Sequence, residues 1–216
     1  MFNTLKNSIY INNLYNQIEE SEKIKGTAKH DLSHVWNVIE LVEKILTQLH
    51  LENDFIESTK IAALFHDIGC INGKKGHAKR SYQMAKDYFE NNNILFPYYP
   101  QVLEAIKDHG SSFESDSLMT LILILCDKLD ITKERLAHEG YETYGIRQLQ
   151  YIESVKVKID DNYLHIDFKT DSKIDLKELN DFDFLDKVFK AITAFSNHQN
   201  LKAIVKINNG IWNRDR

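Results

Sequence analysis

The chain has 216 residues and a formal net charge of −5, from 27 Lys and Arg against 32 Asp and Glu. This length can bury a sizeable core and can form one domain or two. The negative net charge argues against a dedicated DNA-binding protein, because proteins of that class bind nucleic acid through a basic surface.

Helical hydrophobic periodicity governs the chain up to about Ala137. The whole chain contains only two prolines and eight glycines, which is typical of a compact, helix-rich protein. The pattern predicts six helices, over Ile9 to Glu22, Leu32 to Leu49, Asp54 to Phe65, Ala78 to Glu90, Tyr99 to Asp108 and Ser117 to Leu129.

After about Gly140 the pattern changes. Residues 155–159 and 164–169 alternate apolar and polar side chains around the turn signal Asp160-Asp161-Asn162, which predicts a β-hairpin. A helical stripe then runs from Phe184 to Phe195, and residues 201–207 indicate a third strand. We therefore predict a mainly α fold: a helical bundle over residues 1–147 and a small α+β appendage over residues 148–216. Oligomerisation, ligand sensing and shielding of a site are all open roles for the appendage.

Targeting signals are not evident. Residues 1–7 are polar and interrupted, unlike a secretory signal. The most apolar run, Leu118 to Cys126, is far shorter than the ~20 residues that span a bilayer. Cys70 and Cys126 lie in apolar surroundings without CxxC spacing, which favours buried, reduced thiols. We expect a cytoplasmic protein with no membrane partner.

The adjacent pair His66-Asp67 ends an apolar helical stretch, residues 61–65. An imidazole and a carboxylate at the end of a buried helix need partners, because burying them unpaired costs several kcal/mol. A divalent metal ion accepts both groups as ligands. The pair therefore indicates a metal site.

Other residues could complete such a site. His34 lies one turn inside a helix that Asp31 can cap, beside its apolar face. Asp127 ends the most apolar run, and His109 follows an amphipathic helix just before Gly110. Asp130 could hydrogen-bond a ligand, although a carboxylate just past a helix end is more often a cap or an ion-pair partner.

Five segments occur in an order that resembles the HD-domain metal-dependent phosphohydrolase superfamily, over roughly residues 28–138: HDLSHVWNV, AALFHDIG, GHAKRSYQMA, AIKDHG and CDKLD. The resemblance implies a first metal on His34, His66, Asp67 and Asp127. It also implies a second metal on His77 and His109, with Asp67 bridging the two. One departure is Asn37, which stands where many relatives have an arginine after the first histidine.

This ligand set predicts hydrolysis of a phosphate ester, because a bound metal lowers the pKa of its water toward neutrality. The predicted enzyme is a metal-dependent phosphohydrolase acting on a phosphomonoester or a nucleotide. We place Asp67, His109 and Lys128 in its catalytic group. Nitrogen and oxygen ligands suit one or two divalent ions, from among Mn, Fe, Co, Ni, Zn or Mg. A nucleotide or metal sensor without turnover, a scaffold stapled by metal, and a di-iron oxygenase-type enzyme are the alternatives, and a homo-oligomer is compatible with each.

Cationic residues near the ligands are candidates to bind the substrate phosphate. They are Lys74, Lys75, Arg80 and Arg135, together with Lys128. His30 precedes His34 by one helical turn and could face the same cleft. The alternative for the lysines and arginines is an ordinary solvated surface charge.

Overall fold

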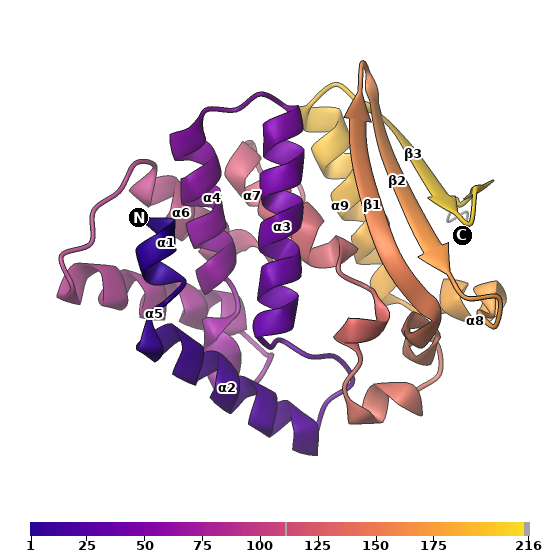
Figure 1. Ribbon diagram of the computed structural model, residues 1–216, viewed down its shortest axis with the longest axis horizontal. Coiled ribbons are helices and arrows are strands. Elements are labelled where there is room, and N and C mark those ends of the chain that lie inside the picture. Colours follow the sequence, from indigo (N-terminus) through magenta and orange to yellow (C-terminus); the bar gives the residue numbers. More distant parts are fainter. Residues whose placement is uncertain (111, 214–216) are drawn as a thin grey trace.

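The computed structural model describes residues 1–110 and 112–213, and it confirms the mainly α fold with a small C-terminal sheet. Helices gather on one side of the molecule and a four-stranded sheet forms the other side (Figure 1). Helix α9 lies between helix α7 and the sheet. Within the described residues, no helix is both long enough and apolar enough to cross a membrane.

The six predicted helices are confirmed, with ends that differ by a few residues from the prediction. The N-terminal helices are α1 (Phe2–Leu5), α2 (Ile9–Ile24), α3 (Leu32–Gln48), α4 (Asn53–Phe65), α5 (His77–Asn91), α6 (Tyr99–Asp108) and α7 (Leu118–Leu129). Four 3-10 helices follow α4 and α7: η1 (Ile68–Asn72), η2 (Lys133–Arg135), η3 (His138–Tyr141) and η4 (Ile146–Tyr151). The predicted boundary between residues 147 and 148 falls within η4, and the division into two units stays a prediction.

Helix α3 begins where the sequence predicts, because Asp31 caps it. The Asp31 carboxylate accepts a hydrogen bond from the His34 backbone N–H at 3.1 Å. The apolar stripe of α3 then packs into a core that continues through α4 and α7. Helix α7 is the centre of this core, since every residue from Met119 to Leu129 is buried. A charged residue near the end of α7 is therefore held in a rigid, dry environment.

The sheet has the order β1-β2-β3-β4. Strands β1 (Ile152–Asp160) and β2 (Tyr163–Thr170) form the predicted antiparallel hairpin, and Asp161 takes a positive φ of 48° in its turn. Strand β3 (Lys202–Ile207) pairs parallel to β2, from Tyr163↔Lys202 to Phe168↔Ile207. The connection carries α8 (Leu176–Asn180) and α9 (Phe184–His198), and β4 (Gly210–Ile211) adds a short edge.

Glu178 on α8 joins the C-terminal part to η4. Its carboxylate accepts hydrogen bonds from the backbone N–H of Gly145 at 2.9 Å, from Arg147 at 2.7 and 2.9 Å, and from Gln148 at 2.9 Å. The ion pair with Arg147, despite the cost of burial, lowers the pKa of Glu178. The carboxylate therefore holds the start of η4 in place.

Glu178→Ala is expected to reduce the free energy of unfolding by about 1–3 kcal/mol, because the Gly145 N–H and the Gln148 amide lose their acceptor. A depressed folded-state pKa stabilises the fold above the unfolded value of about 4.3, and this contribution is lost as pH falls through the folded pKa. Urea unfolding at pH 7 and in acid would measure both effects. Equal stability of the two proteins at pH 7 would contradict the expectation.

Candidate metal centre

The six predicted metal ligands converge from the ends of five helices. His34 lies in the first turn of α3, and the pair His66-Asp67 directly follows α4. The other three are His77 at the start of α5, His109 at the end of α6 and Asp127 in the last turn of α7. All are buried except the half-buried His77. The structure thus brings together the residues that the sequence predicts to lie together.

The Asp67 carboxylate is the centre of this cluster. Its Oδ2 lies 3.2 Å from His66 Nε2 and 3.5 Å from His34 Nε2. Its Oδ1 lies 3.1 Å from His77 Nε2 and 3.5 Å from His109 Nε2. Asp127 Oδ1 joins the first pair, at 3.3 Å from His34 Nε2. The six candidate ligands therefore form two groups that share Asp67: His34, His66, Asp67 and Asp127, and Asp67, His77 and His109. A third group of possible ligand atoms also includes Asp67, with His30 and Cys70.

Three of the four imidazole rings are oriented by backbone carbonyls. His66 Nδ1 donates to the Ala63 carbonyl at 2.7 Å, His77 Nδ1 to the Lys74 carbonyl at 2.8 Å, and His109 Nδ1 to the Ile106 carbonyl at 2.8 Å. A carbonyl only accepts, so each of these Nδ1 atoms carries the proton. In the neutral ring, Nε2 is then left as an unprotonated acceptor.

The Nε2 atoms of the four histidines lie close to one another and to the carboxylate oxygens, which are also hydrogen-bond acceptors. His34 and His66 approach with their Nε2 atoms 3.3 Å apart, His77 and His109 with theirs 2.9 Å apart, and both pairs face the Asp67 oxygens. Lone pairs that converge in this way repel one another unless a proton or a metal cation lies among them. Neutral imidazoles whose other nitrogen is held by a protein acceptor are the usual arrangement of metal-bound histidines. The residues therefore fit a divalent metal.

The pKa shifts indicate the same preference for cations. Burial and the charge of Arg135 lower the pKa of His34, but its contacts with Asp127, Asp130 and Asp67 raise it overall to about 10. Burial would raise the pKa of Asp67, yet the surrounding histidines, His66 first, hold it well below its usual value. The carboxylates thus stay ionised within the core and attract positive charge.

Asp130, at the C-terminal end of α7, orients the first histidine. Its Oδ2 accepts from His34 Nδ1 at 2.7 Å, and its Oδ1 accepts from Asn37 Nδ2 at 3.1 Å. Of the two interpretations of Asp130, the structure therefore supports the one expected less often, a hydrogen-bond partner of a ligand. Asn37 thus supports this carboxylate from one turn further along α3.

Asp130→Asn is expected to weaken metal binding about 10–100-fold, the usual effect of removing the partner of a metal-bound histidine. The amide has one acceptor oxygen, so it cannot serve both His34 and Asn37. Competition with a chromophoric chelator would measure the change, and Asn37→Ala would separate loss of the Asn37 contact from loss of the charge. An unchanged affinity in Asp130→Asn would exclude this orienting role.

The predicted substrate contacts separate into two groups. His30, Lys74 and Arg135 line a cavity of about 190 Å³ beside the cluster, and Asp130 also lines it. Lys75 and Arg80 are not among the lining residues. The Arg80 guanidinium donates to the carbonyls of Gly69, Gly73 and Lys75, so it fastens the loop that precedes His77.

Two of the predicted cations lie next to Asp127. Lys128 is buried, and its Nζ pairs with Asp127 Oδ2. Arg135 is also buried, with Nη2 3.9 Å from Asp127 Oδ1, and its Nη1 has no hydrogen-bond partner among the described residues. Arg135 therefore has donor capacity that the described part of the chain leaves unused.

His30 has a partner that the sequence does not reveal. Its Nδ1 lies 2.5 Å from Glu22 Oε1, and its backbone N–H donates to Glu22 Oε2 at 2.6 Å. Both residues are buried, which lowers the pKa of His30 and raises that of Glu22. Glu22 belongs to α2, and no motif marks it, so only the fold brings it to the site.

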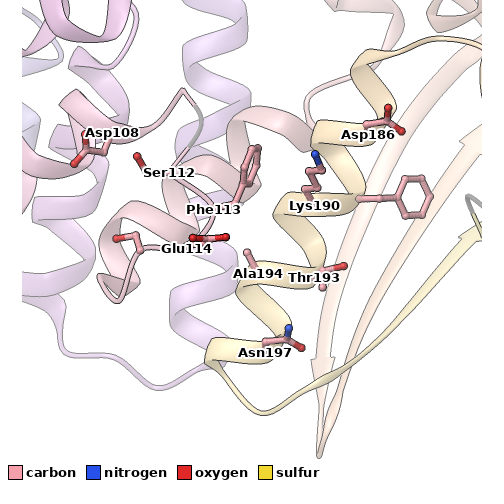
Figure 2. Close-up of a pocket in the computed structure, with 11 residues that line it drawn as sticks. Asp108, Ser112, Phe113, Glu114, Asp186, Lys190, Thr193, Ala194 and Asn197 are labelled. Carbon is pink, nitrogen blue, oxygen red and sulfur yellow. The ribbon is translucent and has the colours of Figure 1, made fainter.

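A larger cavity, about 1100 Å³, lies elsewhere, between residues 112–115 and helix α9. Figure 2 shows Lys190 and Ala194 of α9 on one side of it, and Phe113 and Glu114 on the other side. None of the six candidate ligands lines this groove. None of them lines the smaller cavity either, but two of its lining residues contact the cluster: Asp130 accepts from His34, and Arg135 Nη2 lies 3.9 Å from Asp127 Oδ1. We therefore place the chemistry beside the smaller cavity.

Comparison with known families gives a match that covers the ligand cluster. Residues 31–132 match the family model described as HD domain. The match contains all six candidate ligands, together with Asn37 and Asp130. It leaves η2 to η4, the sheet, α8 and α9 outside.

Proposed function

Because this chain carries an HD domain, a fold of metal-dependent hydrolases, we propose that it is a metal-dependent phosphohydrolase. Its substrate is a phosphomonoester or a nucleotide, and the reaction releases phosphate to water.

The observation that carries this proposal is the position of Asp67. Its two carboxylate oxygens face two different histidine pairs, His34 with His66 and His77 with His109. A bridging carboxylate of this kind suits a pair of ions, and paired ions are common in enzymes that cleave phosphate esters.

These residues would hold one or two divalent ions, which would supply Lewis acidity and lower the pKa of a bound water molecule. With nitrogen and oxygen donors and no thiolate in the two groups, Mn, Fe, Co, Ni and Zn are the best candidates. Side chains of this chain would bind the substrate and balance the charge of the ligands.

Arg135 and Lys74 are the groups that would bind the phosphate oxygens. Both line the cavity beside the cluster, and Arg135 Nη1 has no partner among the described residues. Lys128 balances the charge of Asp127 through its ion pair. The contact with Glu22 holds the His30 ring beside His34 and His77, with ring centroids 6.1 and 6.5 Å away. His30 also lines the cavity, so it can contact a substrate held there.

Phosphate release tests the proposal. The purified protein would be stripped of metal, reloaded in turn with Mn, Fe, Co, Ni, Zn or Mg, and assayed against phosphomonoesters and nucleotides. We expect release that requires metal and disappears in Asp67→Ala. No release from protein shown to bind metal would overturn the proposal and favour a sensor.

A further inference from the structure

Four apolar residues from outside the HD match form one side of the 190 Å³ cavity. They are Ile146 and Leu149 of η4, Phe182 and Phe184. We call these four the apolar wall. Phe182 and Phe184 stack with ring centroids 5.8 Å apart and planes at 25°. The C-terminal part of the chain thus contributes directly to the space beside the candidate metal centre.

The remaining lining residues are mostly polar, and two of them, Lys74 and Arg135, are cations. Arg135, with only 8% of its surface exposed, leaves Nη1 without a partner among the described residues. An unpaired guanidinium nitrogen at a buried site is costly, and an anionic ligand is the group that satisfies it. Asp130 also lines the cavity, but its carboxylate already accepts from His34 and Asn37. A ligand that fits this cavity is therefore anionic at one end and apolar at the other.

The size of the cavity limits the apolar end. Sites for drug-sized ligands measure about 300–1,000 Å³, whereas this cavity measures about 190 Å³. A nucleoside would also bring ribose hydroxyls and base amides against the apolar wall, whose four residues offer no polar side chain. Such groups would lose hydrogen bonds to water without replacement.

The apolar wall is held in place before any ligand binds. Gly145 has a φ of +81°, and a Cβ at this position would lie 3.2 Å from Phe182 Cα, so the two segments are in close contact. Glu178 accepts from the Gly145 N–H at 2.9 Å and so anchors the same segment. A preformed pocket selects ligands by shape more strongly than one that must close around them.

Building on the proposed phosphohydrolase activity, we propose that the substrate is a phosphomonoester of a compact apolar or aromatic alcohol rather than a nucleotide. Phe182 and Phe184 are the specificity-determining residues. The C-terminal part of the chain therefore determines which ester the metal centre receives.

Kinetics on three esters test this selectivity: phenyl phosphate, methyl phosphate and a nucleoside 5′-monophosphate. We expect kcat/KM for phenyl phosphate to exceed kcat/KM for each of the other two esters by about tenfold or more, which is the usual gain in specificity from filling an apolar pocket. Phe184→Ala should remove most of this preference, and Phe182→Ala provides a second variant of the same wall. Phe189→Ala is the matched control, because this half-buried phenylalanine of α9 lines the wide groove and not the cavity. A preference for the nucleotide in the native protein would overturn the inference and leave the phosphohydrolase proposal standing.

Binding to the metal-loaded protein separates the two proposals when no ester is cleaved. Calorimetry would compare phenylphosphonate with methylphosphonate, which share the anionic end. Tighter binding of phenylphosphonate by about tenfold, lost in Phe184→Ala but kept in Phe189→Ala, would support the cavity assignment even if turnover is absent. Equal affinities would overturn it.

Discussion

Asp67→Ala is expected to lower metal-dependent phosphate release by about 1,000-fold or more while the protein stays folded. Both candidate ion sites use this carboxylate, so the variant loses a ligand from each at once. Metal ions contribute several kcal/mol to such reactions, and each 1.36 kcal/mol corresponds to a factor of ten in rate. Initial rates at saturating metal, together with metal content per chain, would measure the effect.

Asp87→Ala is the control for this experiment. Asp87 is an exposed residue of α5 whose carboxylate accepts a hydrogen bond from Gln83 Nε2 at 2.7 Å, one turn away. It should keep native activity and metal content. Near-native turnover by folded Asp67→Ala would show that the cluster is not the centre of the reaction.

Gly69→Ala is expected to destabilise the protein by about 1–3 kcal/mol or more and to reduce binding of the second ion. A Cβ on Gly69 would lie 2.4 Å from the His77 carbonyl oxygen and 2.6 Å from the Ser81 backbone nitrogen. Backbone atoms must then move, and they belong to the first turns of α5, which position His77. Urea unfolding and metal stoichiometry would report the two effects separately.

Two other glycines give matched comparisons. A Cβ on Gly140 would also lie too close to backbone, 2.2 Å from the Thr27 carbonyl oxygen. Gly140 belongs to η3, however, outside the helices that carry the ligands. The Gly140→Ala variant should therefore be less stable and still bind both ions. Gly110 directly follows His109, and a Cβ on it would lie 4.0 Å from Ala78 Cβ, which is ordinary van der Waals contact. Gly110→Ala should therefore change neither stability nor metal binding. A stable Gly69→Ala protein that binds two ions would contradict the role assigned to this close approach.

The amino-acid sequence is sufficient to predict the long helices and the ligand cluster. Apolar residues at helical spacing predict α3, α4 and α7, and the polar residues that interrupt them at their ends have few partners other than a metal. The resemblance to the HD-domain superfamily, in addition to this pattern, then places His34, His66, Asp67 and Asp127 together. The short elements α1, α8 and β4 are absent from the prediction, because four, five and two residues carry too little periodicity to be recognised.

Contacts between distant segments are not predictable in the same way. Glu22 reaches His30 from the end of α2, and Asn37 meets Asp130 across 93 positions of the chain. Neither pair has a local pattern that identifies it. Arg80 is predicted as a substrate contact from its position after His77, yet its guanidinium donates to three backbone carbonyls of the preceding loop. The identity of a cation is visible in a sequence, but its hydrogen-bond partners depend on the fold.

The parallel pairing of β2 with β3 has a consequence for the order in which the chain folds. The β1–β2 hairpin closes through a turn of two residues, so it can form early from local contacts. Strand β3 can join only after residues 171–201, which include α8 and α9, have crossed the sheet. Closing this long connection costs chain entropy before the contacts between β2 and β3 can stabilise the sheet. We therefore expect β3 to join the sheet late in folding. The C-terminal sheet would then assemble from its hairpin outward, with α9 docked on α7 before the last strands are in register.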